Sequence, residues 1–475
     1  MPKATKKTVM RSGRLGRTAS VAAQAANLLL VNMIPKSLSH ETAQDSEPSI
    51  AVNPSNPNQI VGTAFTPDPM GGPTAPIFVS NDGGRTWALR STVPSATDTG
   101  DISPRFGGNG RLYTGILKNP GDLLLNILRT ANAAGTTPMG VLSNRNSVDQ
   151  PFLAAVTLGG KDRVYVGNND FAAAGGRTAT IDRSLDGAAP APAFRSVRVE
   201  RRDTGSAGQN GPQVRPACHS DGTVYAGFYG WRSFAANSEV TSDVVLVRDD
   251  QGASGQNSFS ALVDPQDGLP GRLVAKNVRF KWNDLLGNQR IGGDIAIAVD
   301  PRNSDIVYLA WADRQPAIGY TLHVRRSSDR GATWSANDLR TIGRATNPAL
   351  AINNRGKVCF LYQRVTGSGA SQRWVTTAER STDGVNWSSL ILATVPANFP
   401  VPQFQPYIGD YAGLAAVGKD FYGIFSTNNS PDRARFPNGV VFQRNCDFAT
   451  RRLLDLDDTT PVAVSIDPFF FKIAE

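Results

Sequence analysis

The sequence has few cysteines, few histidines and no long hydrophobic run. Its three cysteines are widely spaced, and it contains no CxxC pair or Cys/His cluster, so neither a disulfide framework nor a zinc site is supported. We therefore expect the cysteines to be buried free thiols. Three histidines argue against a histidine metal site and against a Ser-His-Asp triad. The one candidate membrane segment, residues 25–31, is far too short to span a bilayer.

Long helical periodicity is also missing, whereas glycine and proline are abundant. The 46 glycines and 31 prolines are dispersed along the chain, which favours many short strands and turns over a helix-rich fold. The apolar fraction of 40% is ordinary for a globular protein and excludes disorder for most of the chain. The 475 residues do not fix the number of domains, because repeat folds exceed the usual domain size.

Acidic residues are absent from the first 17 residues, which carry six lysines and arginines of a chain with net charge +9. Basic tails can bind nucleic acid or anionic surfaces. The rest of the chain is only mildly basic and has no interleaved basic and aromatic pattern. We therefore do not expect nucleic acid to be a partner.

Residues 1–45 differ in composition from the rest, and the sequence predicts a basic N-terminal arm with a short amphipathic helix over residues 18–32. Three roles remain open for this arm: docking on a larger protein assembly, which we favour, cleavable export, or a disordered tail. We expect a secreted, cell-surface or exported-assembly location rather than a cytoplasmic one. Removing residues 1–40 is expected to leave the remaining domain folded.

From residue 46 to residue 475, one unit recurs. A small apolar strand is followed by a turn rich in Asp, Asn and Gly, then by a strand ending in aromatics, and then by a strand entering a Ser-x-Asp-Gly turn. Repeats of this length, with three or four strands each, are typical of a β-propeller, in which radial stacking buries the faces of every sheet. We predict an all-β propeller of seven blades, with six as the alternative. The C-terminal strand over residues 462–473 is expected to complete a terminal blade. The inner strands start near residues 48, 102, 151, 214, 295, 348 and 412.

A turn motif recurs after the third strand of these units. Two copies fit Ser-x-Asp-x-Gly-x-Thr-Trp, and two more are degenerate. The aspartate can accept hydrogen bonds from its own turn amides, the glycine permits positive φ, and the tryptophan packs between sheets. The copies contain Ser80, Asp82, Gly84 and Trp87; Ser327, Asp329, Gly331 and Trp334; Ser381, Asp383, Gly384 and Trp387; and Ser184, Asp186 and Gly187.

This motif resembles the Asp-box, or bacterial neuraminidase repeat, of sialidases and related β-propellers. The resemblance implies a sialidase-like propeller in which the boxes lie on the outer rim, away from the active centre. The boxes themselves therefore do not establish catalysis.

Sialidases of this kind bind the substrate carboxylate with three arginines and use a Tyr/Glu nucleophile pair and an Asp acid/base. Guanidinium groups suit this task because they form bidentate, charge-assisted pairs with carboxylates. The family's Arg-Ile-Pro motif is missing here: the chain has Met33-Ile34-Pro35 and no arginine between residues 18 and 84. The resemblance leaves as catalytic candidates Arg105, in place of the missing arginine, with Glu200, Arg215, Arg290 and Tyr407.

Polar residues stand at the start of every inner strand, where a propeller has the mouth of its central channel. Carboxylates and amides there suit sugar hydroxyls or a hard cation such as calcium, and they can equally cap the strands and bind channel water. We expect that the protein requires no cofactor, and calcium is the candidate if an ion binds at the mouth. The segment 405–413 has two interpretations. Its two tyrosines and one aspartate can bind a sugar, or its glycines can allow close packing of the last blade. The mouth candidates are Glu47, Asp101, Asp149 beside Gln150, Arg215, Asp294, Asn347, Asp410 and Tyr411.

Two classes of function follow, and the sequence favours the first by a narrow margin. The first is a binding or docking module that recognises a glycan or a protein and lacks a complete sialidase set. The second is an exo-α-sialidase-type glycoside hydrolase with a diverged site. A carbohydrate enzyme using paired carboxylates, such as Asp101 with Asp294 or Asp410, is a third reading.

Overall fold

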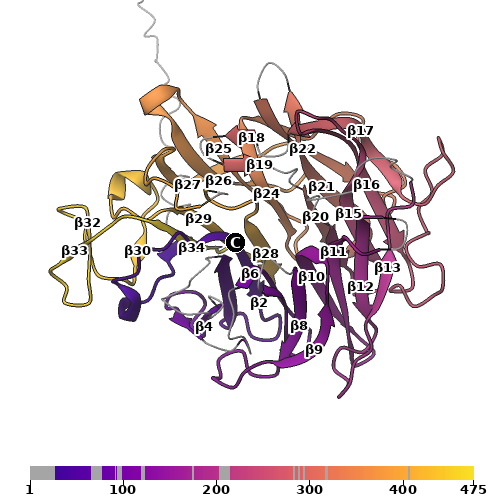
Figure 1. Ribbon diagram of the computed structural model, residues 1–475, viewed down its shortest axis with the longest axis horizontal. Helices are drawn as coiled ribbons and strands as arrows, with labels where there is room; N and C mark the ends of the chain where they lie inside the picture. The colour runs from indigo at the N-terminus through magenta and orange to yellow at the C-terminus, as the bar shows by residue number, and fades with distance from the viewer. Residues whose placement is uncertain are drawn as a thin grey trace, which may run out of the picture.

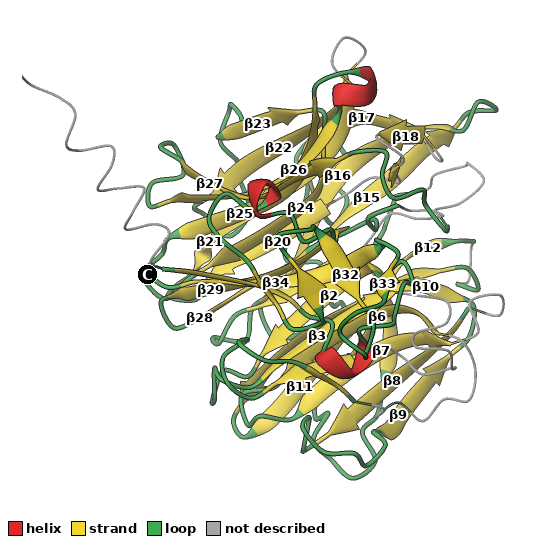
Figure 2. Ribbon diagram, turned by 90° about the vertical axis from the view of Figure 1, so that its left-hand side faces the viewer, coloured by secondary structure: helices red, strands yellow, loops and turns green. Residues whose placement is uncertain are grey.

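The computed structural model is almost entirely β-structure. Short 3₁₀ helices at η1 (Lys36–Leu38), η3 (Gly369–Ser371) and η4 (Arg433–Arg435) are the helical elements of the described residues (Figure 2). No helix in this part of the chain is long and apolar enough to cross a membrane. The described residues are 27–65, 77–90, 93, 99–118, 123–173, 176–202, 214–281, 284–286, 289–291, 295–315, 319–404 and 407–475.

Six sheets in these ranges have four antiparallel strands, and each sheet takes its strands in chain order. The first three are β2 (Ser46–Val52), β3 (Ile60–Phe65), β4 (Ile77–Ser80) and β5 (Ala88–Leu89); β6 (Thr99–Phe106), β7 (Leu112–Lys118), β8 (Leu124–Thr130) and β9 (Gly140–Arg145); and β10 (Val148–Leu158), β11 (Lys161–Asp170), β12 (Thr178–Ser184) and β13 (Arg195–Arg198). The next three are β14 (Arg215–Cys218), β15 (Val224–Phe234), β16 (Glu239–Asp249) and β17 (Arg272–Lys281); β20 (Ile295–Asp300), β21 (Asn303–Gln315), β22 (Gly319–Ser327) and β23 (Arg340–Gly343); and β24 (Ala345–Ile352), β25 (Val358–Thr366), β26 (Arg373–Ser381) and β27 (Ser388–Pro396).

A further sheet has five strands and joins the two ends of the described chain. Its order is β28 (Gly413–Val417), β29 (Asp420–Asn428), β34 (Ile466–Ile473), β1 (Leu28–Asn32) and β30 (Val441–Phe442). Two small sheets, β18 (Asp284–Leu286) with β19 (Gln289–Ile291), and β31 (Cys446–Asp447) with β32 (Arg452–Leu454) and β33 (Pro461–Val462), complete the strands.

The large sheets are arranged as the blades of a β-propeller. The first strand of each sheet packs against the first strand of the next, from β2 through β6, β10, β14, β20 and β24 to β28, which packs on β2 again. Figure 1 shows these inner strands around the centre, with the chain colour advancing around the ring. The predicted all-β propeller is therefore confirmed, and the described ranges contain seven such sheets. The inner strands begin within a few residues of the positions expected from the repeats.

The last blade is closed by the N-terminal segment. Strand β1 pairs antiparallel with the C-terminal strand β34, with Leu28 opposite Ile473 and Asn32 opposite Phe469, and Figure 1 shows the indigo and yellow segments side by side. The expectation of a helix is wrong for the described residues 28–32, because their consecutive apolar side chains satisfy a strand buried on both faces. Residues 1–26, with the rest of the expected helix, lie outside the described residues.

Apolar residues from adjacent sheets form the cores between the blades. One cluster joins β1, β2, β3, β29 and β34 and includes Val31, Ile50, Trp87 and Phe470, all less than one-tenth exposed. The rings of Trp87 and Phe470 lie 5.1 Å apart. All three cysteines are free, as predicted, but only Cys359 is fully buried.

The Ser-x-Asp turns that resemble Asp-boxes lie between the third and fourth strands of their sheets, on the outer side of the propeller. In the box after β22, Ser327 Oγ donates to Asp329 Oδ1 at 2.8 Å and accepts from the Gly331 amide at 2.8 Å. Asp329 also accepts from the amide of Thr333 at 2.8 Å, and the indole of Trp334 donates to the Gly331 carbonyl at 3.2 Å.

The other two well-formed boxes repeat this pattern. Their serines, Ser80 and Ser381, donate to Asp82 at 2.8 Å and to Asp383 at 2.9 Å. Their tryptophans each donate at 3.0 Å to the carbonyl of a box glycine. The turns therefore satisfy their own polar groups, which is a structural role.

Candidate functional site

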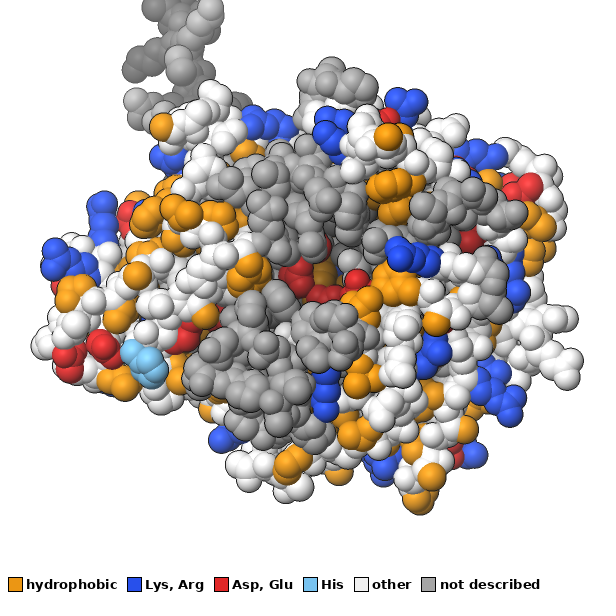
Figure 3. All heavy atoms as spheres, viewed as in Figure 1, with side chains coloured by type: hydrophobic (Ala, Val, Ile, Leu, Met, Phe, Trp, Pro, Cys, Tyr) orange, Lys and Arg blue, Asp and Glu red, His pale blue; other side chains and the backbone are white. Residues whose placement is uncertain are grey.

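The inner strands enclose a narrow cavity at the propeller axis. It measures about 80 Å³ and takes at least one lining residue from each inner-strand segment, among them Ser49, Ser103, Phe152 and Arg215. This volume holds water molecules rather than a sugar ring. Figure 3 shows acidic side chains, with hydrophobic ones beside them, in a hollow at the middle of the face turned to the viewer. A ligand larger than a few waters therefore does not fit inside this cavity.

A recurring backbone irregularity shapes this mouth. Glu47, Gln150 and Asn347 all have φ between 53° and 54°, each precedes a proline, and the strand register shifts at each of them. Positive φ at a non-glycine residue is strained and persists only where the surroundings hold it. The amide of Asn347 shows such support: its Nδ2 donates to Gln363 Oε1 at 2.9 Å and to the carbonyl of Gly409 at 3.0 Å.

Tyr411 is the centre of the mouth cluster. Its phenol donates to Asp101 Oδ1 at 3.0 Å, and its ring meets that of Phe152 edge-on, with centroids 5.2 Å apart. Burial raises the pKa of Tyr411 well above its ordinary value, and the carboxylates of Asp101 and Glu47 raise it further. The phenol is therefore a neutral hydrogen-bond donor at physiological pH. Three of the predicted mouth residues, Glu47, Asp101 and Tyr411, are thus brought together.

Arg215 lies against the same aromatic rings. Its Cζ is 3.2 Å from the ring centroid of Phe152 and 5.5 Å from that of Tyr411, and its Nε donates to the carbonyl of Ile295 at 3.1 Å. A cation over a ring face is attracted by the ring quadrupole. This arginine therefore ties the aromatic side of the mouth to the neighbouring blade.

Arg105 lies in the wall of the channel and also lines the cavity. It donates to the carbonyls of Ile50 at 2.9 Å and Leu153 at 3.1 Å, and burial lowers its pKa. Its hydrogen bonds join three neighbouring inner strands. The two arginines that the sequence proposed for substrate binding therefore share one cavity, and both make contacts that connect blades.

The remaining candidates from the sialidase resemblance do not join this cavity in the described structure. Tyr407 is 1% exposed and packs with Val365 and Trp374, so its phenol is not a nucleophile at the mouth. Burial raises its pKa far above the ordinary value. Glu200 is fully buried, pairs with Arg232 at 3.2 Å and accepts from the Arg202 amide at 2.8 Å, which leaves it no part in a Tyr/Glu pair.

Other predicted residues are placed as follows. Asp149 is half-buried and accepts from the amide of Gln150 at 2.8 Å, and Asp410 is 4% exposed in the segment that enters β28. Asp294 and the side chain of Arg290 lie outside the described residues. Of the three arginines that the resemblance proposes, Arg105 and Arg215 are thus the two whose side chains are described.

Sequence reasoning missed two features. Phe152 was not proposed as a site residue, although it follows the mouth residue Gln150 by two positions along an inner strand. A group of three buried carboxylates, Glu41, Asp45 and Asp467, was also missed, because Asp467 lies more than 400 residues from the other two in the chain and no spacing pattern connects it to them.

No protein-family model and no curated protein matches the sequence. Among solved structures, the chain is similar to an α-L-arabinofuranosidase from Fusarium graminearum in complex with an iminosugar inhibitor, with 13% identity, a TM-score of 0.42 and coverage of 70% of this chain and 92% of that one. It is also similar to the NanB sialidase of Streptococcus pneumoniae, with 10% identity, a TM-score of 0.37 and coverage of 83% and 66%.

A third similar structure is a lectin from Aleuria aurantia in complex with a fucosylated sugar, with 7% identity, a TM-score of 0.37 and coverage of 68% and 87%. Likeness at this level does not extend to individual site residues. The fold assignment therefore rests on the sheets and their packing described above.

Proposed function

We propose that this propeller binds a carbohydrate over the mouth of its central channel and lacks a complete sialidase set. The observation that carries the proposal is the cluster in which Tyr411 donates to Asp101 while Phe152 and Arg215 pack against its ring. Aromatic side chains with carboxylate acceptors beside them are the groups that recognise sugar rings and hydroxyls. A docking role for the basic N-terminal residues in an exported assembly is a separate part of this proposal.

A binding role is favoured over sialidase chemistry by the positions of two candidates. A tyrosine nucleophile requires a base beside it and an open path to the substrate. Among the described residues, Tyr407 is buried with apolar side chains and its phenol has no hydrogen-bond partner, and Glu200 is bound to Arg232.

A glycoside hydrolase is the second candidate, and one contact favours it. The phenol of Tyr411 lies 3.0 Å from Asp101 Oδ1, within the reach expected of a nucleophile and its base. In that case Tyr411 would take the role that the resemblance assigned to Tyr407.

A glycan array probed with the full chain, followed by calorimetric titration of the best ligand, tests the binding proposal. Removing the hydroxyl in Tyr411→Phe is expected to weaken binding by about tenfold, which corresponds to the loss of one hydrogen bond worth ~1.4 kcal/mol. Tyr229→Phe is the matched control, because that buried phenol bonds the carbonyl of Ala312 at 2.8 Å and does not line the cavity.

The same proteins, incubated with a panel of fluorogenic glycosides that includes a sialoside between pH 4.5 and 7.5, separate the two candidates. The binding proposal expects no turnover above buffer. Turnover that Tyr411→Phe abolishes would establish the hydrolase instead. Absence of any glycan ligand, or equal affinity of both tyrosine variants and the native chain, would overturn the proposal.

A further inference from the structure

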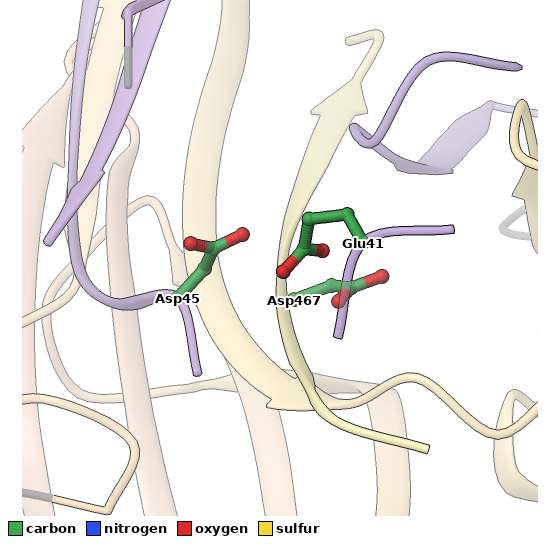
Figure 4. Close-up of side chains that lie close together, drawn as sticks. All are labelled: Glu41, Asp45 and Asp467. Atoms are coloured by element: carbon green, nitrogen blue, oxygen red, sulfur yellow. The ribbon is translucent and has the colours of Figure 1, made fainter. Parts of the chain in front are cut away.

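Three buried carboxylates meet where the two ends of the described chain come together. Glu41 and Asp45 lie between strands β1 and β2, and Asp467 lies on β34. Their exposed fractions are 8%, 4% and 0%, and one oxygen from each lies within 4.8 Å of the others. Figure 4 shows the carboxylate of Glu41 pointing between those of Asp45 and Asp467.

Among the described residues, Arg444 is the cation that forms ion pairs with this cluster. Arg444, itself fully buried, lies 3.0 Å from Asp467 Oδ2 through its Nη1, and its Nη2 donates to the backbone carbonyls of Ser39, at 2.8 Å, and Glu41. If all three carboxylates were ionised, the cluster with its one guanidinium would carry a formal charge of −2. A buried charge of this size is costly unless something compensates it.

The three carboxylates differ in how well the protein satisfies them. Asp467 accepts hydrogen bonds from Asn32 at 2.7 Å, from Asn429 at 2.7 Å and from Ser465 at 3.1 Å, in addition to Arg444. These donors orient its carboxylate and satisfy both of its oxygens.

Glu41 is only half satisfied. Its Oε1 accepts from the Ala43 amide, whereas its buried Oε2 has no hydrogen-bond donor in the described part of the chain. The Nη1 of Arg444 is 3.8 Å away, beyond hydrogen-bond distance. A buried oxygen without a donor, on a carboxylate that points between two others, is a position that a metal ion would satisfy.

We propose that Glu41, Asp45 and Asp467 bind one divalent cation, calcium or magnesium. A charge of +2 neutralises the cluster, and an all-oxygen set with no thiolate or imidazole suits these hard cations. Glu41 Oε2 and Asp45 are the main ligands, while Asp467 contributes charge and an orientation fixed by its hydrogen bonds. The ion joins the segment before β2 to the C-terminal strand β34 and so stabilises closure of the ring. This proposal is independent of carbohydrate binding.

The test is calorimetric titration of the full chain with CaCl₂ or MgCl₂ at pH 7.5, after treatment with EDTA and removal of the chelator. About one ion per chain is expected to bind, and saturation is expected to raise Tm by a few degrees. Glu41→Gln and Asp45→Asn are expected to abolish both effects. Asp186→Asn, which removes a carboxylate paired with Lys161 near the surface, is the matched control and is expected to retain them.

The variants also report on folding, because each removes charge from a buried cluster. In EDTA, Asp45→Asn and Glu41→Gln are expected to unfold at or above the Tm of the native chain, since less uncompensated charge remains. If neither variant folds, the titration of the native chain decides alone. The proposal would be overturned if the native chain bound no ion, or if both variants kept the binding. It would also be overturned if the Tm of the chelated native chain changed with pH between 6 and 9 but not with metal, which would show that protons compensate the charge.

Discussion

Removal of strand β1 is the perturbation with the largest expected effect on the fold. A chain that begins at Asn27 keeps this strand, whereas a chain that begins at Pro35 loses it. The lost segment includes Leu30, Val31, Met33 and Ile34, which are between 0% and 3% exposed. Burial of four such side chains contributes roughly 6–12 kcal/mol at ~1.5–3 kcal/mol each, as an upper estimate. That is comparable to the entire stability of a typical domain, about 5–15 kcal/mol.

Urea unfolding followed by tryptophan fluorescence measures this effect. The chain that begins at Asn27 is expected to unfold in one cooperative transition, and the chain that begins at Pro35 to be insoluble or without a native baseline. This replaces the expectation that residues 1–40 can be removed without loss of the fold. Equal transition midpoints for the two chains would refute the role of β1 in closing the last blade.

Two further predictions concern packing and pH. Gly84→Ala is expected to destabilise the fold by on the order of 1–3 kcal/mol more than Gly160→Ala. Both glycines have positive φ, but a Cβ at Gly84 would lie 2.0 Å from a ring atom of Phe470, whereas a Cβ at Gly160 would meet nothing within 4 Å. Equal losses of Tm in the two variants would contradict this. The carboxylate of Glu379 accepts two hydrogen bonds from Arg340 of the neighbouring blade, at 2.6 and 2.7 Å. Burial raises the pKa of Glu379, but the hydrogen bonds from Arg340 and from its other partners outweigh burial and lower this pKa below 4.5. The stability from this pair is therefore complete above about pH 4.5 and is lost as the pH falls through the lowered pKa. Denaturation at pH 7 and pH 3 should show Glu379→Gln costing more at pH 7, and an equal cost at both values would count against the ion pair.

The repeats made most of the fold predictable from the sequence. Each inner strand recurs with the same small apolar residues before a turn, so the starts of β6, β20 and β24 could be placed within three residues. The Asp-boxes were equally readable, because the hydrogen bonds of Asp82 and Asp329 are local and depend only on neighbouring residues.

The closing strand and the site were harder to predict because they depend on distant partners. The pattern over residues 18–32 fits an amphipathic helix, whereas its described part, Leu28–Asn32, is a strand because it pairs with β34. Whether Tyr411 or Tyr407 lines the central cavity depends on which side of the segment faces the channel. A spacing shared with another family does not contain that information.

The most direct test of carbohydrate binding at the channel mouth is a crystal structure of the full chain grown with the glycan that it binds best. We expect a sugar over the channel mouth, in contact with Tyr411 and Phe152 and within hydrogen-bond distance of Asp101. A sugar bound at the Asp-box rim or elsewhere, with the same mouth residues in contact only with water, would contradict it.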